Sequence, residues 1–228
     1  MRLLWDEVRP GAARDAHPPG APTGPDDPHG GFTGAARQDQ RYAARHALAA
    51  GLVRLGLVPD LPDTHRRIGL AGPAAVRRIC WDGAALRPPL QFSIAHTADQ
   101  VVVALRRADP PPAGLGVDAE TAWDTAARNL HRFGTPAELD ALHRACGPVE
   151  PLHLWCVKEA LAKASGLGFR TPPKRYRLHP AGPPGRLTVE IAGAGPAGHR
   201  RPARIRAGTR TATGRPPTAW AVADLPTH

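Results

Sequence analysis

Residues 155–169 of the chain read WCVKEALAKASGLGF, and this stretch guides the interpretation of the rest of the sequence. Apolar side chains recur in it and just before it at the spacing of one helix face, at Leu154, Val157, Leu161 and Ala164. Gly166 and Gly168 follow, and glycine tolerates the left-handed backbone found just past a helix end. The pattern predicts a helix over residues 152–165 with one apolar stripe.

Two charged side chains share a face of this helix. Glu159 and Lys163 are four residues apart, and their face lies opposite the apolar stripe. The simplest interpretation is a solvated ion pair on an amphipathic surface helix, because such pairs are common there. The segment at residues 116–120, GVDAE, suggests another. If it is a strand, Asp118 and Glu120 project from the same side.

Carboxylates held side by side repel each other and usually need a cation. A site made only of oxygen ligands suits Mg²⁺, which takes one or two protein carboxylates together with waters and substrate phosphates. Glu159 can supply a third carboxylate, with Lys163 one turn further along the helix. These residues therefore form a candidate metal and phosphate site.

The two motifs together resemble those of the 4'-phosphopantetheinyl transferases, in the longer monomeric type that activates peptide and polyketide synthases. The family pattern is Gly-hydrophobic-Asp-x-Glu and, some forty residues later, Trp-x-x-Lys-Glu-Ala-x-x-Lys. This chain carries it at Gly116, Asp118, Glu120, Trp155, Lys158, Glu159, Ala160 and Lys163. The resemblance extends over roughly residues 41–225 and is firmest over residues 92–169.

This resemblance implies a fold and an activity. The expected fold is α+β, with two similar α/β halves (a pseudo-dimer) and the active site in the cleft between them. The expected reaction is Mg²⁺-dependent transfer of 4'-phosphopantetheine from coenzyme A to a serine of a carrier protein, which releases 3',5'-adenosine bisphosphate. The carriers would be acyl or peptidyl carrier domains of fatty acid, polyketide or nonribosomal peptide synthases, which links the chain to secondary metabolite biosynthesis.

The resemblance also assigns roles to residues of both motifs. Asp118, Glu120 and Glu159 would hold Mg²⁺ against the pyrophosphate, and Lys163 would neutralise or protonate the leaving phosphate. The serine proton could go to Glu159 or to a water on the metal. Lys158 would contact phosphate or be a solvated neighbour, and Trp155 would pack rather than react.

Coenzyme A contacts are expected in the first half. Arg41 and Arg45 fall on the apolar face of a helix predicted at residues 38–55, where they either extend to water or reach an anionic ligand. The family has basic residues here for the 3'-phosphate of coenzyme A. By the same resemblance, His96 in the segment FSIAHT would touch the phosphates of the coenzyme. Arg87 is a further coenzyme A candidate.

Two positions depart from the family pattern. Ala95 replaces a common serine, and Leu86 replaces a glycine next to Arg87. A non-catalytic family member is therefore one alternative. Another is a basic nucleic-acid-binding module, suggested by the arginines at residues 199–210, although no recognised nucleic-acid-binding motif accompanies them. A different Mg²⁺-dependent phosphate enzyme is the third, and the sequence lacks the commonest phosphate-binding loop.

Composition narrows the class of protein. The 228 residues carry a formal net charge of +10, which favours anionic ligands or an acidic partner. Three widely spaced cysteines without a Cys-x-x-Cys motif indicate reduced thiols in a cytoplasmic protein. No apolar run is long enough to cross a bilayer, and the first residues do not form a signal peptide. We expect a cytoplasmic monomer that binds neither nucleic acid nor membrane.

The chain divides near three consecutive prolines at residues 110–112. We expect an N-terminal half over residues 1–112 on the coenzyme A side, with a mobile loop at about residues 10–36. A second half at residues 113–228 would carry the metal-binding and catalytic motifs. Residues 59–72 are expected to form a loop, and residues 92–105 a hairpin that turns at residues 97–100.

Overall fold

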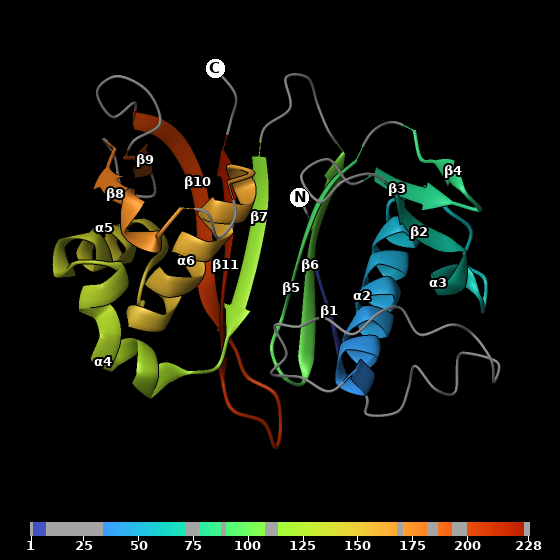
Figure 1. Ribbon diagram of the computed structural model, residues 1–228, viewed down its shortest axis with the longest axis horizontal. Coiled ribbons are helices and arrows are strands. Elements are labelled where there is room, and N and C mark those ends of the chain that lie inside the picture. Colours follow the sequence, from blue (N-terminus) through green and yellow to red (C-terminus); the bar gives the residue numbers. More distant parts are fainter. Residues whose placement is uncertain are drawn as a thin grey trace.

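The computed structural model describes eight stretches of the chain, namely residues 2–7, 34–71, 78–87, 90–107, 114–167, 171–181, 187–192 and 200–225. Within them the molecule is a mixed α/β protein whose strands pair in antiparallel fashion, which fits the expected α+β class (Figure 1). Among the described residues no helix is both long enough and apolar enough to span a membrane.

The N-terminal part contains two three-stranded sheets. The larger has the order β1-β6-β5 and lies against α2. The smaller has the order β2-β3-β4 and follows the short helix α3. The bounds are β1 (Arg2–Glu7), α2 (Gly34–Arg54), α3 (Thr64–Arg67), β2 (Ile68–Ala71), β3 (Arg78–Trp81), β4 (Ala84–Ala85), β5 (Leu90–His96) and β6 (Gln100–Arg107).

The C-terminal part contains one five-stranded sheet with the order β7-β11-β10-β9-β8. Helix α6 packs directly against β7 and β11, and α4 and α5 pack around it. The bounds are β7 (Gly114–Glu120), α4 (Trp123–Phe133), α5 (Pro136–Cys146), α6 (Pro151–Ala164), η3 (Pro173–Arg175), β8 (Tyr176–Pro180), β9 (Leu187–Ile191), β10 (Arg200–Arg210) and β11 (Thr218–Leu225).

Capping residues and a glycine mark helix ends in the C-terminal part. The hydroxyl oxygen of Thr135 accepts from the backbone N–H of Glu138, with Pro136 at the first helical position, so α5 begins as the sequence predicts. Glu150 and His153 cap the start of α6 reciprocally. Just past its end, Gly166 has a φ of 72°, a left-handed conformation that glycine adopts without strain.

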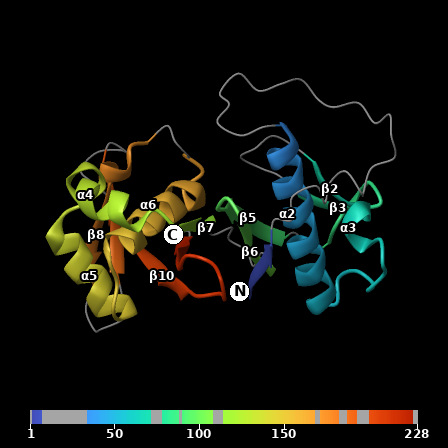
Figure 2. The same ribbon diagram turned by 90° about the horizontal axis from the view of Figure 1, so that it is seen from below.

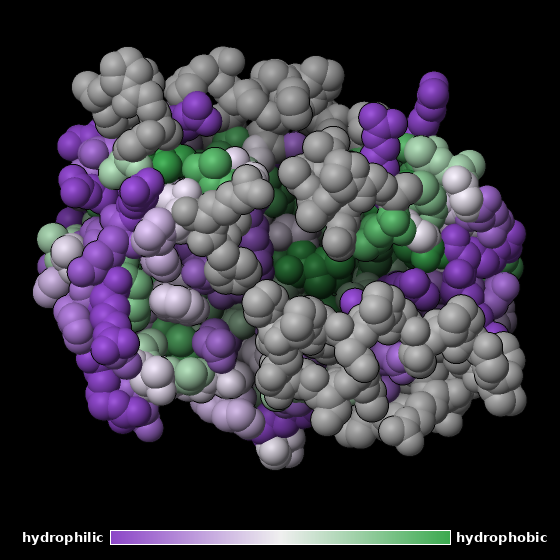
Figure 3. Space-filling view, viewed as in Figure 1, coloured by the Kyte–Doolittle hydropathy of each residue, from purple (hydrophilic) through white to green (hydrophobic). Residues whose placement is uncertain are grey.

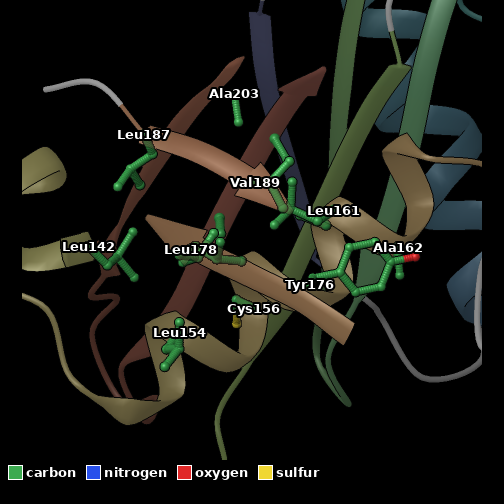
Figure 4. Close-up of a cluster of buried hydrophobic side chains, with 14 of the residues drawn as sticks. Leu142, Leu154, Cys156, Leu161, Ala162, Tyr176, Leu178, Leu187, Val189 and Ala203 are labelled. Atoms are coloured by element: carbon green, nitrogen blue, oxygen red, sulfur yellow. The ribbon is translucent and has the colours of Figure 1, made fainter. Parts of the chain in front are cut away.

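Three hydrophobic clusters define the layers. One lies between α2 and the N-terminal sheet, and another between α6 and the C-terminal sheet, part of which Figure 4 shows around Leu161, Tyr176 and Val189. The third lies between the two sheets and joins Ala95, Val102 and Ala104 to Leu115, Val117, Ala119 and Val222. Strand β6 contributes side chains to two of these clusters, because Val101 and Val103 face α2 whereas Val102 and Ala104 face the other sheet. The order of layers is therefore helix, sheet, sheet, helix, with α2 and α6 on opposite outer sides (Figure 2).

Polar contacts also join the two parts. The backbone N–H of Val117 in β7 donates to the Ser93 hydroxyl in β5 over 3.0 Å. The Gln100 side-chain amide donates to the Thr218 hydroxyl over 3.2 Å, and Arg106 forms an ion pair with Asp224 at 2.6 Å. These contacts tie strands β5 and β6 to strands β7 and β11.

The expected elements are mostly present, with two corrections. Residues 34–36 open helix α2 rather than ending a mobile loop, and the rest of the expected loop lies outside the described residues. Residues 59–72 are not all loop, because Thr64–Arg67 forms a helix and Ile68–Ala71 a strand. The hairpin turn at residues 97–100 is confirmed by the hydrogen bond from the Thr97 N–H to the Gln100 carbonyl. The division near residue 112 falls outside the described residues and stays a prediction.

Candidate functional site

The site begins with an unusually close approach of strand β7 to helix α6. A Cβ atom added at Gly116 would lie 1.8 Å from the carbonyl oxygen of Ala160, and one at Gly114 would lie 1.8 Å from that of Ala164. Only glycine allows this separation, because no heavy side-chain atom fits there. Asp118 follows Gly116 by two residues and so faces the same side of the strand, toward α6.

The ammonium of Lys163, in the last turn of α6, reaches this strand. It donates to Oδ1 of Asp118 over 2.9 Å and to the carbonyl oxygen of Val117 over 2.9 Å. A third, longer contact of 3.4 Å goes to the carbonyl oxygen of Ile94 in β5. Lys163 therefore links α6 to β5 and to β7, which are edge strands of two different sheets, and its ion pair is with Asp118 in β7.

The carboxylates of the motif interact with one another. Burial raises the pKa of Asp118, Glu120 raises it further, and Lys163 opposes both effects. Burial also raises the pKa of Glu159, a residue that is 8% exposed, and the charge of Asp118 adds to that rise. The Oε1 atom of Glu120 accepts from the backbone N–H of Thr121 over 2.7 Å. Two carboxyl groups thus carry an electrostatic cost that a nearby cation would relieve.

These residues fit a hard divalent cation by their donor chemistry, since all three offer carboxylate oxygens. Within the described stretches, however, no three His, Cys, Asp or Glu side chains have converged to metal-ligand spacing. The cation beside Asp118 is instead the Lys163 ammonium.

A pocket of about 620 Å³ lies on the N-terminal side of this site. Arg41, Arg45 and His96, all predicted from sequence, line it together. The rest of the lining is mainly apolar and comprises Gln40, Ala44, Leu48, Ile68, Leu70, Ile94 and Val101. In Figure 3 apolar surface gathers near the middle of the molecule, beside the position that α2 occupies in Figure 1. The pocket combines two guanidinium groups with an apolar wall, which suits a ligand that has both a phosphate and a planar or apolar body.

His96 connects the pocket to the acidic site. It ends strand β5 and has an exposed ring, yet surrounding protein lowers its pKa, and the charge of Lys163 lowers it further. Asp118 and Glu120 act in the opposite direction on the same ring. Ile94 makes a second connection, since its side chain lines the pocket and its carbonyl oxygen accepts from Lys163.

The structure corrects the expectation for Lys158. Its side chain is fully buried, its ammonium is paired with Glu138, and it also donates to the carbonyl oxygen of Tyr176. The same Glu138 carboxylate accepts from the backbone N–H of Leu178 over 3.0 Å. Lys158 is therefore part of the core that joins α5, α6 and β8, and its fully buried ammonium is not exposed to contact a phosphate.

Arg87 does not join the other predicted coenzyme A residues. It is exposed on the turn after β4 and is not among the described residues that line the pocket. Trp155 packs as expected, with its ring edge-to-face against Phe133 at 5.2 Å between centroids. Helix α6 itself is almost entirely buried, so the solvated surface helix of the simplest interpretation is wrong.

Sequence reasoning missed part of the pocket. Ile68 and Leu70 form its wall from strand β2, in a region expected to be loop. The available signal was the alternation of two apolar residues around Gly69, which is weak in so short a segment. Ser93, the acceptor that joins β5 to β7, was also not singled out.

Comparison with known families bears on the half of the chain that holds the acidic site. Residues 114–196 match the model of the 4'-phosphopantetheinyl transferase superfamily. This stretch is a domain of that superfamily. It contains Asp118, Glu120, Glu159 and Lys163, whereas the pocket-lining residues of α2, β2, β5 and β6 lie outside the superfamily match. A comparison with curated proteins found no match.

Proposed function

We propose that the protein transfers 4'-phosphopantetheine from coenzyme A to a serine of an acyl or peptidyl carrier protein, with Mg²⁺ as cofactor. The observation that carries the proposal is the position of the Arg41, Arg45 and His96 pocket beside the Asp118 and Lys163 pair, connected through Ile94. The superfamily match over residues 114–196 supports phosphopantetheinyl transfer in general. Carrier domains of fatty acid, polyketide or nonribosomal peptide synthases, and thus secondary metabolism, are the finer part of the proposal.

The proposal assigns coenzyme A to the pocket. The guanidinium groups of Arg41 and Arg45, one helical turn apart, would bind its 3'-phosphate. The apolar wall would face the adenosine, and His96 would donate to the pyrophosphate. At neutral pH a lowered pKa makes His96 a neutral hydrogen-bond donor rather than a second full charge. The pyrophosphate would then lie toward Asp118 and Lys163.

In the proposed reaction the serine oxygen of the carrier forms a bond to the phosphorus that bears the pantetheine arm. The phosphorus–oxygen bond to 3',5'-adenosine bisphosphate breaks, and that product leaves with the bonding electrons. Glu159, whose pKa burial and the charge of Asp118 raise, would take the serine proton. Lys163 would neutralise charge on the leaving phosphate. Mg²⁺, held by Asp118, Glu120 and Glu159, would supply further neutralisation of the pyrophosphate.

The proposal also covers the architecture and setting of the enzyme. The β1-β6-β5 sheet and the five-stranded sheet each carry a long helix on the outer side, which is compatible with two similar halves and a reaction site where β5 meets β7. We propose that the chain is of the longer, monomeric type and works in the cytoplasm. Its three cysteines are all free thiols, which agrees with a reducing compartment.

Mass spectrometry of an apo carrier protein tests this function directly. Incubation with the protein, coenzyme A and Mg²⁺ should add one phosphopantetheine, about 340 Da, to the carrier serine. Glu159→Gln should abolish the gain, whereas Asp140→Asn, at an exposed carboxylate of α5, should leave it unchanged. A carrier of unchanged mass after incubation with folded wild-type protein would refute the proposal.

The pocket assignment needs its own measurement. Arg41→Ala and Arg45→Ala should each weaken coenzyme A binding in calorimetry, by about tenfold for one charge-assisted contact. They should weaken dephospho-coenzyme A, which lacks the 3'-phosphate, far less. Arg144→Ala, in α5, serves as the control because Arg144 is exposed and far from the pocket lining. Equal losses for both ligands would place the 3'-phosphate elsewhere.

Nucleic-acid binding remains the alternative with a structural observation in its favour. Arg200, Arg204 and Arg206 are exposed on β10, and they alternate with Ala203 and Ile205, which face the α6 side. These arginines therefore lie on the opposite face of the sheet from Asp118. A salt-dependent shift of duplex DNA, unaffected by coenzyme A and lost in an Arg204→Ala, Arg206→Ala double variant, would favour this alternative.

A further inference from the structure

The Lys163 ammonium has three N–H groups and three acceptors around it. The acceptors are Oδ1 of Asp118, the carbonyl oxygen of Val117 and the carbonyl oxygen of Ile94, at 2.9, 2.9 and 3.4 Å. Its side chain is only 28% exposed and that of Asp118 only 14%. An ammonium has three donors, so each of them is directed at the protein and none is left for a ligand.

The surroundings explain why a cation sits at this point. Asp118 is desolvated, and the charges of Glu120 and Glu159 lie close enough to interact with it. Without Lys163, Asp118 would lose its ion pair and the acidic groups would repel one another, which is costly in a partly buried site. The ammonium therefore neutralises, within the protein itself, the same cluster that would bind a divalent metal.

We propose that Lys163 occupies the cation position beside Asp118 and that a divalent cation binds by displacing it from that carboxylate. This inference rests on the proposed function only in taking Mg²⁺ as the cation. Mg²⁺ requires ligand oxygens at about 2.0–2.1 Å, and an ammonium bonded to the same carboxylate would be repelled at that range. Displacement frees the donors of Lys163 for an anionic ligand, so metal binding and phosphate binding by this residue become successive events.

The exchange also reaches the pocket. When Lys163 leaves its present position, the Ile94 carbonyl oxygen loses the donor from α6, and Ile94 lines the pocket with Arg41 and His96. Metal occupancy and the pocket are thus connected through one side chain. Before it is displaced, Lys163 positions α6 against β5 and β7. It can contact a phosphate only after displacement.

Calorimetry with MgCl₂ alone, in the absence of coenzyme A, tests the competition. Lys163→Met removes the charge and keeps much of the side-chain volume, so Mg²⁺ should bind about tenfold more tightly than to wild type. Lys163→Arg keeps a competing cation and should stay near wild type. An unchanged or weaker Mg²⁺ affinity in a folded Lys163→Met variant would overturn the proposal.

A double-mutant cycle separates competition for Asp118 from general repulsion. In an Asp118→Asn background, Lys163→Met should no longer tighten Mg²⁺ binding, because the shared carboxylate is gone. If Lys163→Met tightens binding equally in both backgrounds, Lys163 acts only as a distant charge and the displacement is wrong.

The lysine composition gives a second test on the wild-type protein. The chain has only three lysines, Lys158, Lys163 and Lys174, so a spectrum of ¹⁵N-lysine ammonium groups has three possible signals. Mg²⁺ should shift the Lys163 signal and speed its exchange with water, while the core-paired Lys158 and the exposed Lys174 stay unchanged. A Lys163 signal that stays in place at saturating Mg²⁺ would refute displacement even if the variants failed to fold.

These outcomes are distinguishable from failure of the proposed function. Mg²⁺-dependent transfer to a carrier together with unchanged Mg²⁺ affinity in Lys163→Met would reject the displacement alone. No Mg²⁺ binding to any variant together with no transfer would reject both.

Discussion

The Cα atom of Gly116 lies so close to helix α6 that a methyl group there would be 1.8 Å from the carbonyl oxygen of Ala160. This contact sets the distance between β7, which carries Asp118, and α6, which carries Glu159 and Lys163. The obstacle is backbone rather than a flexible side chain, so it cannot move aside without shifting a turn of the helix. The glycine of the first motif therefore has a structural reason that is independent of any ligand.

Gly116→Ala should destabilise the fold by at least about 2–3 kcal/mol, because the added methyl group overpacks the interface between β7 and α6. Urea unfolding followed by circular dichroism measures the change. Gly69→Ala is the matched control, since a Cβ there meets only the Cβ of Cys80 at 3.9 Å, an ordinary contact. Similar stability of the two variants would show that β7 can retreat from the helix at little cost.

Lys158→Met should cost about 3–5 kcal/mol, because it leaves the Glu138 carboxylate buried without its partner. Adding Glu138→Gln should recover a large part of the loss, since an amide oxygen can still accept from the Leu178 N–H. Lys174→Met, at an exposed position, should change stability by less than about 0.5 kcal/mol. If the Lys158→Met variant kept its stability but bound coenzyme A more weakly, Lys158 would contact phosphate after all, against the conclusion drawn from its burial.

Glu159→Gln should raise Tm at pH 7 in the absence of metal. Burial raises the folded-state pKa of Glu159, so between the unfolded and folded values only the native state holds the proton. Stability is therefore lost as pH rises through that window, and above it the wild type carries the full cost. Each kcal/mol of stabilisation should raise the Tm of the variant by about 2–4 °C. This difference in Tm from the wild type should disappear below pH about 4.

Thermal scans from pH 3 to pH 8 measure this difference. Asp140→Asn, an exposed carboxylate of α5, controls for the general effect of removing a negative charge. A Glu159→Gln advantage that is constant with pH would mean that packing rather than ionisation produces it.

His65 should make the N-terminal part sensitive to acid. Its ring stacks on His46 with centroids 3.9 Å apart, and burial first, then His46, Arg66 and Arg45, lower its pKa, while Asp63 opposes them. The native state therefore binds the proton less readily than the unfolded chain. Stability should fall as pH drops below about 6.5 toward the lower folded value.

His65→Phe keeps an aromatic ring against His46 and Tyr42, so it should flatten the acid loss in urea midpoints measured between pH 5 and pH 8. His131→Phe, at an exposed position of α4, is the control and should keep the wild-type slope. Equal slopes in all three proteins would assign the acid sensitivity to other groups.

The elements nearest the motifs could be predicted from sequence because their signals are local. Thr135 and Pro136 mark the start of α5, and Gly166 marks the end of α6, as the structure confirms. Arg41 and Arg45 were assigned to one helix face, and they do line one pocket with His96. The metal assignment to Asp118, Glu120 and Glu159 stays a prediction.

The remaining features depend on contacts that no local pattern reveals. Helix α6 is buried on nearly all sides because β7 and β11 pack along it, with Lys163 turned toward β7, and α4 and α5 pack around the rest. Lys158 is in the core because Glu138, twenty residues earlier, supplies its counter-charge. Ile68 and Leu70 form a strand because β3 pairs with them, and the short segment itself carries little preference.

The strand order of the C-terminal sheet has a consequence for the boundaries of the superfamily match. That match ends at residue 196, yet β7 pairs with β11, which begins at Thr218. A fragment cut at the limits of the match would lose both β10 and β11, the two strands that join β7 to β9, together with the alanines of β11 that pack under α6. The smallest portable unit, for expression or for grafting into another protein, therefore has to extend through Leu225.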